Sequence, residues 1–338
     1  MKKIIALVGL LAAFLVFLFL VYLPGGRQEE LSFAFFVYDK SDTFIQEMTS
    51  HMIASLPENV SYETFDAGNS QSVQNRQIVE AIDGGFDIFI INTVDRLAAG
   101  TIVERLCRED IPIIFFNREP LEEDIVGRHN VFYVGAATDV QGTRQADIAV
   151  GHFFGTGLKR AGDTVGLVIL KGEHGHQDAE IRTASSLERL NEHGLYPEIL
   201  AIESANWRRA DARQIMSGIY ARHGGQIDLI LSNNDDMALG AIDFLLEESV
   251  FIQGEDVPFI IIGVDGTPVG LQAVYDGFIY GTVLNDIEQQ TDAILTLADY
   301  IVHGRDMGSF PFAITNGHFI YIYGDIVTRD IIYKHISQ

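Results

Sequence analysis

The sequence predicts an α/β protein with two doubly wound lobes, each a parallel β-sheet covered by helices on both faces. From residue 31 onward, short apolar runs alternate with helical segments, as in sheets whose strands are joined by right-handed crossovers. Several strands are continuous apolar runs, which is typical of sheets buried on both faces. The strand–helix units are too many for one sheet of ordinary size, so we expect two lobes with a cleft between them.

Each strand is predicted from a short run such as LSFAFFV or PIIFFN, and each helix from the longer segment that follows it. In the first half of the chain we expect strands over 31–37, 60–66, 87–92, 112–117 and 131–135, and helices over 44–56, 70–83, 97–108 and 139–154. In the second half we expect strands over 164–171, 197–204, 229–233, 259–264 and 281–285, and helices over 177–193, 208–222, 235–248 and 287–303.

The first 30 residues are set apart from this pattern. Lys2 and Lys3 precede a mostly apolar run over residues 4–23, which predicts an N-terminal hydrophobic helix long enough to span a bilayer, since about 20 residues suffice. A positively charged start is also typical of a secretory signal, although no clear A-x-A cleavage site follows. A cleaved signal peptide and an uncleaved membrane anchor over residues 1–30 are both open. Either one places the rest of the chain in the periplasm or otherwise outside the cytoplasm, secreted or tethered by residues 4–23.

The charge balance excludes several classes of partner. Lys and Arg number 23 against 47 Asp and Glu, a formal net charge of −24. Nucleic acid needs a basic footprint, and so does docking on anionic lipid, so neither fits this chain. Cys107 is the one cysteine, which excludes an intrachain disulfide framework. We expect a monomer that binds no nucleic acid.

The most informative motif is LKGEHGHQDAEIR, residues 170–182. An apolar strand ends in it and a helix opens near Gln177, so His176, Asp178 and Arg182 lie at a strand end and in the first turns of a helix. Asp178 and Arg182 are four residues apart and share one helix face. Because ligands of doubly wound sheets bind beyond the carboxyl ends of the strands, these side chains predict a site for a small polar ligand.

Hydrogen-bonding side chains follow the other strands in the same way. Sugar hydroxyls both donate and accept, which Asn, Asp and Arg satisfy, and an aromatic face covers the C–H patch of a sugar ring. Phe44 and Trp207 supply such faces, so the combination predicts a carbohydrate site. Its polar members are Tyr38, Asp42, Asn117, His176, Asp178, Arg182, Asn234, Asp265 and Asn285.

Short segments spread over the chain match one family in that family's order. They are YDKSDTF (38–44), IINTVD (90–95), AAGT (98–101), FFNREP (115–120), YVG (133–135), LKGEHGHQDAEIRT (170–183), NNDDMALGA (233–241), GVD (263–265) and GTVLND (281–286). From Leu31 onward the chain resembles the galactose/glucose-binding family of type I periplasmic sugar receptors of ABC importers. The resemblance implies the type I periplasmic binding protein fold.

In that fold three crossovers join the lobes, here near residues 134–137, 285–286 and 319–323, and the lobes close around the ligand by a hinge motion. The resemblance divides the chain into an N-terminal lobe, 31–134 plus 286–319, and a C-terminal lobe, 135–285 plus 320–338.

The resemblance also implies a receptor that binds D-galactose or D-glucose as a hexopyranose. It would deliver the sugar to the membrane permease of an ABC importer, with a chemoreceptor as a further partner. The sugar would lie between Phe44 and Trp207, and the polar residues named above carry the family's residue types. In the family the residue matching Asp42 meets the 4-hydroxyl in either orientation, so both sugars are accepted. A receptor for another sugar, such as a pentose, is the alternative.

One segment departs from the family. Its members carry a calcium loop of the EF-hand kind in the C-terminal lobe. The corresponding stretch, residues 155–166, is shorter and offers one carboxylate, Asp163, beside Lys159 and Arg160; the family's distal ligand falls on Asp228. Because too few hard oxygen ligands are left, we predict that the calcium site is lost and that the protein has no cofactor.

Other functional classes fit less well. A glycosidase using Asp42 and Asp178 would need an acid of raised pKa, whereas pairing with Arg and Asn predicts ionised acceptors. A repressor's ligand domain is disfavoured by the exported N-terminus and the lack of a basic helix-turn-helix. His174 and His176 could ligate a metal, but no third ligand stands at metal spacing. We therefore expect a binding protein and no enzyme.

Overall fold

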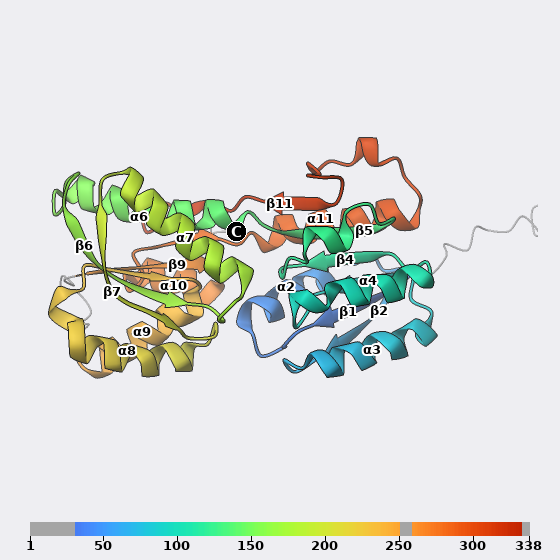
Figure 1. Ribbon diagram of the computed structural model, residues 1–338, viewed down its shortest axis with the longest axis horizontal. Coiled ribbons are helices and arrows are strands. Elements are labelled where there is room, and N and C mark those ends of the chain that lie inside the picture. Colours follow the sequence, from blue (N-terminus) through green and yellow to red (C-terminus); the bar gives the residue numbers. More distant parts are fainter. Residues whose placement is uncertain (1–30, 251–258, 333–338) are drawn as a thin grey trace, which may run out of the picture.

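The computed structural model describes residues 31–250 and 259–332, which form two lobes side by side along the long axis of the molecule (Figure 1). Each lobe contains a six-stranded sheet with helices on both faces. The predicted α/β fold class with two parallel-sheet lobes is therefore confirmed. The predicted N-terminal helix lies outside the described residues, and no helix within them is long and apolar enough to cross a bilayer.

The first sheet has the strand order β11-β5-β4-β3-β1-β2, and every neighbouring pair in it is parallel. The strands of its centre are buried along their whole length, which explains why they are continuous apolar runs. The strands are β1 (Leu31–Val37), β2 (Val60–Asp66), β3 (Ile88–Ile91), β4 (Ile113–Phe116), β5 (Val131–Ala136) and β11 (Phe319–Ile322).

Helices cover both faces of this sheet. On one face α2 (Thr43–Ala54) packs beside α11 (Ile287–Val302), and Met48 and Leu297 are fully buried there. On the other face lie α3 (Gln71–Gly84) and α4 (Ala99–Arg108). Helix α11 comes late in the chain, so the first lobe is completed by a segment that returns from the second.

The second sheet has the order β12-β10-β9-β8-β6-β7 and is parallel except at its edge, where β12 runs antiparallel to β10. Helices α6 and α7 cover one face, and α8, α9 and α10 cover the other (Figure 1). The elements are β6 (Thr164–Lys171), β7 (Tyr196–Ser204), β8 (Leu229–Ser232), β9 (Ile260–Asp265), β10 (Gly281–Leu284), β12 (Ile326–Thr328), α6 (Thr138–Thr156), α7 (Gln177–Glu192), α8 (Arg209–His223), α9 (Asp235–Glu247) and α10 (Pro268–Asp276).

Every strand and helix predicted between residues 31 and 303 is present, with small differences at the ends. The sequence analysis missed β11, β12, the short helix α5 (Glu122–Ile125) and α10. Helix α10 does carry a start signal: the Thr267 side chain accepts a hydrogen bond from the Gly270 amide, and Pro268 occupies the first turn. Helix α10 is short, and its buried face, which identifies it in the structure, gives too little pattern in the sequence to predict it.

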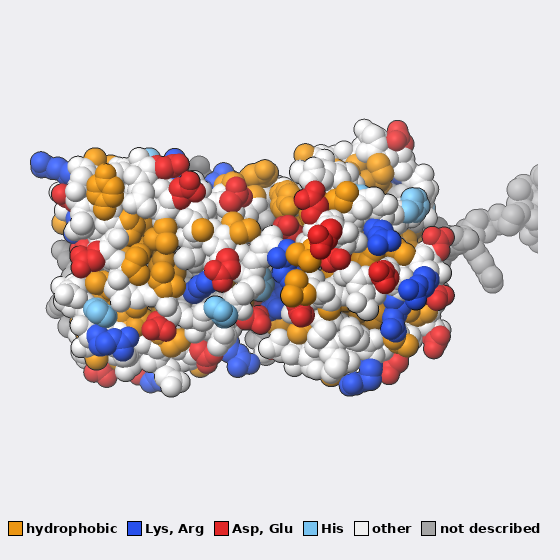
Figure 2. All heavy atoms as spheres, in the orientation of Figure 1, with side chains coloured by type: hydrophobic (Ala, Val, Ile, Leu, Met, Phe, Trp, Pro, Cys, Tyr) orange, Lys and Arg blue, Asp and Glu red, His pale blue; other side chains and the backbone are white. Residues whose placement is uncertain are grey.

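Within the described residues the chain passes between the sheets after β5, after β10 and after β11. The predicted lobe boundaries stay predictions, but β5 runs to Ala136 and β11 to Ile322, a few residues beyond the predicted ends at 134 and 319. Charged side chains of both signs lie along the junction of the lobes (Figure 2). Because the chain crosses between the sheets at these three points, strand ends from both sheets lie at the junction of the lobes.

We predict that Leu297→Ala destabilises the protein by about 2 to 5 kcal/mol, because it leaves a cavity between α11, α2 and the first sheet. Leu295→Ala, on the partly buried side of the same helix, is the matched control and should cost clearly less. Urea unfolding of both variants measures the difference. Equal losses would show that α11 does not pack as described.

Candidate ligand-binding site

A cavity lies between the two lobes, beyond the carboxyl ends of strands from both sheets. Every side chain predicted from the sequence to bind the ligand lines it, and Ile45 and Arg118 join them. The lining residues are Tyr38, Asp42, Phe44, Ile45, Asn117, Arg118, His176, Asp178, Arg182, Trp207, Asn234, Asp265 and Asn285. The structure thus brings together residues that lie up to about 250 positions apart in the chain, because parallel strands end at the same edge of a sheet.

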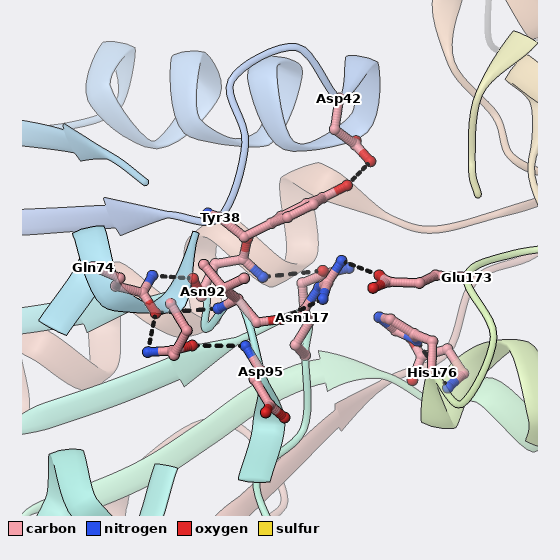
Figure 3. Close-up of polar contacts among 12 residues, drawn as sticks. Tyr38, Asp42, Gln74, Asn92, Asp95, Asn117, Glu173 and His176 are labelled. Carbon is pink, nitrogen blue, oxygen red and sulfur yellow. Dashed lines mark hydrogen bonds and ion pairs between the residues drawn. The ribbon is translucent and has the colours of Figure 1, made fainter. Parts of the chain in front are cut away.

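On the first-lobe side, Asp42 is held by both of its carboxylate oxygens (Figure 3). The Tyr38 hydroxyl donates to Oδ2 at 2.6 Å, and the Ile45 amide donates to Oδ1 at 3.0 Å, which caps helix α2. Burial raises the pKa of Tyr38, so its hydroxyl keeps its proton and acts as a donor. The carboxylate therefore has a fixed orientation, and only its remaining lone pairs can receive a ligand hydroxyl.

Asn92 holds the Tyr38 backbone and the Asn117 side chain (Figure 3). It is fully buried; its Oδ1 accepts from the Tyr38 amide at 3.2 Å, and its Nδ2 donates to Oδ1 of Asn117 at 3.1 Å. Gln74 donates to the Asn92 carbonyl at 2.9 Å. Because the Asn117 oxygen is used in this way, its amide nitrogen is the end that can donate to a ligand. The sequence analysis quoted the IINTVD segment but did not single out Asn92.

Arg118 is a cavity residue that the sequence analysis missed, although it directly follows Asn117 in FFNREP. Its side chain is buried, and its guanidinium carbon lies 3.9 Å from the centre of the Tyr38 ring. It donates to the Val94 carbonyl at 2.5 Å and pairs with Glu173 at 2.8 Å. Since Glu173 lies in the turn between β6 and α7, this ion pair connects the two lobes beside the cavity.

A second hydrogen bond crosses between the lobes at the start of two helices. The Thr43 hydroxyl in α2 donates to Asp236 in α9 at 2.6 Å. Thr43 directly follows the cavity residue Asp42, and Asp236 lies two residues after the cavity residue Asn234, so the lobes are tied together close to the site.

On the second-lobe side, His176 is the N-cap of α7. Its Nδ1 accepts from the Asp178 amide at 3.2 Å, and its ring meets Trp207 edge-on with centroids 5.1 Å apart. Burial, with the charges of Arg118 and Arg182, holds the pKa of His176 well below its ordinary value. The ring is neutral, and because Nδ1 is an acceptor, Nε2 carries the proton and can donate to a ligand oxygen.

Arg182 is almost fully buried beneath the cavity. It donates to the Asn233 carbonyl and, at 2.6 Å, to Oε1 of Gln141. Its Nε–H has no hydrogen-bond partner among the described residues, so this donor is free to meet a ligand oxygen. The guanidinium charge favours the ionised forms of Asp178 and Asp265.

The carboxyl groups of the cavity correct one expectation from the sequence. Burial raises the pKa of Asp42, Asp178 and Asp265, the last of them well above its ordinary value. Arg182 opposes this shift at Asp178 and Asp265 but does not outweigh it, because desolvation is the larger effect. The prediction that pairing would exclude a raised pKa is therefore wrong. Asp42 nevertheless accepts hydrogen bonds from the Tyr38 hydroxyl and from the Ile45 amide of α2, so it still acts as a hydrogen-bond acceptor.

The remaining polar residues of the second lobe are also held from behind. Asn234 caps α9 by accepting from the Met237 amide at 2.9 Å, and it donates to the Trp207 carbonyl at 3.2 Å. Asn285 donates to Asp265 at 3.3 Å and accepts from Gln290 at 2.7 Å. Both ends of each amide are therefore held by protein groups, which leaves the second N–H and the second lone pair for a ligand.

Three cavity residues other than glycine have left-handed backbone: Asn117 at φ 59°, Trp207 at φ 64° and Asp265 at φ 115°. Such a conformation costs free energy and persists only where the surrounding structure holds it, which is common at ligand sites. Here it turns each side chain back from a strand end or loop toward the cavity. Phe44, at the start of α2, supplies the apolar face of the first lobe.

The residues that replace the family's calcium loop do not fit a calcium ion. Lys159 Nζ lies 2.9 Å from Oδ2 of Asp228, and the Gly166 amide donates to the same oxygen at 2.8 Å. Asp163 accepts from the Arg160 amide at 2.8 Å. Over the part of the chain that the structure describes, no group of three or more His, Cys, Asp or Glu side chains is placed to hold a metal. The loss of the calcium site stays a prediction.

Comparisons with known proteins agree with this architecture. A family model described as "Periplasmic binding protein domain" matches residues 33–306. The chain belongs to the periplasmic binding protein family. A D-galactose/methyl-galactoside binding periplasmic protein of Haemophilus influenzae is 33% identical over 80% of this chain and 81% of its own. A xylitol-binding protein of Mycolicibacterium smegmatis is 30% identical over 81% and 73%.

Among solved structures, an ABC transporter solute-binding protein of Bacillus halodurans with bound myo-inositol covers 92% of this chain and 99% of its own, with a TM-score of 0.73 and 25% identity. These relatives are solute-binding proteins and not enzymes. As a member of this family, the chain is a solute-binding protein of the ABC-transporter kind, and the family implies a place outside the cytoplasm.

We predict that the His176 ring stays neutral as the pH falls through about 6.5, where an ordinary imidazole gains its proton. Nitrogen-detected NMR of the ring, assigned with His176→Gln, should show no titration near this pH. Because the folded pKa is lowered, the stability that His176 contributes is present above about pH 6.5 and falls as the pH drops below it. A midpoint near 6.5 would contradict the described burial.

We also predict that Lys159→Met lowers the free energy of unfolding by about 1 kcal/mol, because it leaves the half-buried Asp228 carboxylate without its cation. Arg160→Met removes an exposed charge from the same turn and should have little effect. A chelator should not change the melting temperature of the wild-type protein. A clear drop with chelator would show that the turn binds a metal.

Proposed function

We propose that this protein binds a hexopyranose, D-galactose or D-glucose, in the cavity between its lobes and delivers it to the membrane permease of an ABC importer. The observation that carries the proposal is that one cavity is lined by Phe44, Trp207 and the polar residues that match the galactose/glucose-binding family. The relative named for galactose binding aligns over most of the chain.

The chemistry of the cavity suits a neutral, polyhydroxylated ligand. Carboxylates accept hydrogen bonds, guanidinium groups donate them, and amides do both, so both roles of each sugar hydroxyl can be met. The cavity carries three carboxyl groups and two guanidinium groups, Arg118 and Arg182, which balance most of its charge.

Closure of the lobes would bury the sugar. The Arg118–Glu173 ion pair and the Thr43–Asp236 hydrogen bond join the lobes next to the cavity, which supports a closed, ligand-holding arrangement. Delivery of the sugar then requires these contacts to break at the permease. A chemoreceptor as a second partner, and the tethering of the chain by residues 4–23, are further proposals that rest on the sequence alone.

We predict that D-galactose or D-glucose binds at least about 10-fold more tightly than D-ribose, D-xylose, xylitol or myo-inositol, since a site built for one hydroxyl pattern leaves its buried polar groups unpaired with another. Trp207 is the one tryptophan of the sequence and lines the cavity, so its fluorescence reports binding directly. Tight binding of a pentose or polyol with no hexose binding would overturn the hexose proposal.

The matched variants of this titration are Asp178→Asn and Asp243→Asn. Asp178 is buried in the cavity, and its loss should weaken hexose binding by about 10- to 100-fold, as for a hydrogen bond to a charged group. Asp243 pairs with Arg209 on the outer side of α9, so its replacement should leave binding unchanged. An equal effect of both would place the sugar elsewhere.

A further inference from the structure

Asp235 is a buried carboxylate that the cavity itself does not use. It is the first residue of α9, directly after the cavity residue Asn234, and its side chain is fully buried. It does not line the cavity. A fully buried carboxyl group is costly to keep, so its contacts must account for it.

Those contacts join two strand ends of the second sheet. Oδ2 of Asp235 accepts from the Gly266 amide at 2.8 Å and from the Thr267 amide at 3.1 Å, just after β9. Oδ1 accepts from the Thr282 hydroxyl in β10 at 2.7 Å. The two amides directly follow the cavity residue Asp265, and Thr282 lies three residues before Asn285. One carboxylate therefore holds both segments that end in cavity residues.

The segment that it holds is strained. Asp265 has φ 115°, a conformation that residues with a side chain rarely adopt. Its carbonyl accepts from the Asn285 amide at 2.9 Å, and its carboxylate accepts from the Asn285 side chain at 3.3 Å. The orientation of the Asp265 carboxyl toward the cavity depends on this backbone conformation. Asp235 holds it through the amides of the next two residues, Gly266 and Thr267.

Two glycines leave the carboxylate no freedom to move. A Cβ atom at Gly263 would lie 2.1 Å from Oδ1 of Asp235, and a Cβ at Gly270 would lie 2.2 Å from Oδ2. The group is thus enclosed by backbone on two sides. Burial and, as a smaller effect, the charge of Asp236 raise the pKa of Asp235 to about 7, although the three donors oppose the shift. Without these donors the ionised form would be less favourable still.

We propose that Asp235 is a positioning residue that sets the orientation of Asp265 and Asn285 for the ligand. It acts through these two side chains and does not touch the ligand. This inference rests on the proposed function, because the ligand hydroxyls are what Asp265 and Asn285 are oriented for.

The test is a double-mutant cycle on binding of the tightest hexose, measured by calorimetry. Asp235→Asn removes the charge and replaces one of the two acceptor oxygens by an NH2 donor, so at least one of the present hydrogen bonds is lost or reversed, and binding should weaken by about 10- to 100-fold. Asp265→Asn should act through the same contact, so Asp235→Asn should add little once Asp265 is changed. With Asp42→Asn, in the other lobe, the effects should be additive.

Controls separate positioning from loss of folding. Asp243→Asn removes a half-buried carboxylate from the same helix, one that pairs with Arg209 and does not line the cavity, and should leave affinity unchanged. Thr282→Val removes only one of the three donors, so it keeps the test available if Asp235→Asn does not fold. It should weaken binding several-fold and show the same coupling to Asp265.

The outcomes are distinct. Wild-type affinity in Asp235→Asn and Thr282→Val, or effects that add equally to Asp265→Asn and Asp42→Asn, would overturn the positioning role while leaving the proposed function intact. If the wild-type protein bound no hexose, the proposed function would fail and this inference would fail with it.

Discussion

The site depends on one geometric constraint: strands of a parallel sheet end at a common edge, and here those edges of two sheets face the same cleft. Tyr38 follows β1, Asn117 follows β4 and Asp265 ends β9. None of these side chains is near another in the sequence, and each reaches the cavity only because its sheet forms. Correct packing of helices such as α11 on the sheets is thereby a condition for binding as well as for stability.

The site also requires that the charges of its buried side chains balance one another. Arg182 lies under Asp178 and Asp265, and Arg118 lies over Tyr38 and close to Asp42, so each lobe brings its own cation to its own carboxyl groups. Even so, desolvation raises the pKa of all three carboxyls. Additional donors, such as ligand hydroxyls, would stabilise the ionised forms. The cavity is therefore arranged so that a polyhydroxylated ligand completes its hydrogen bonding.

Much of this could be predicted from the sequence because strand ends and turns leave local signals. The LKGEHGHQDAEIR motif and the residues after each strand predict most of the lining residues, but neither Ile45 nor Arg118. Arg118, Asn92 and Asp235 were not recognised, because their roles arise from partners in other strands or in the other lobe, which no local pattern records. The prediction about the carboxyl pKa values is wrong for a related reason. Charged partners can be inferred from a sequence, whereas the depth of burial, which outweighs them here, cannot.

This cavity differs from a generic polar cleft because hydrogen bonds within the protein fix the orientation of its polar side chains before a ligand binds. Asp42 is oriented by Tyr38, and His176 is held as a neutral donor by the Asp178 amide. Asn285 has its oxygen occupied by Gln290. A side chain whose role as donor or acceptor is fixed stabilises only a ligand hydroxyl in the matching position. A misplaced hydroxyl leaves that buried side chain without a hydrogen-bond partner. Selectivity therefore depends on the residues behind the cavity as well as on those that line it.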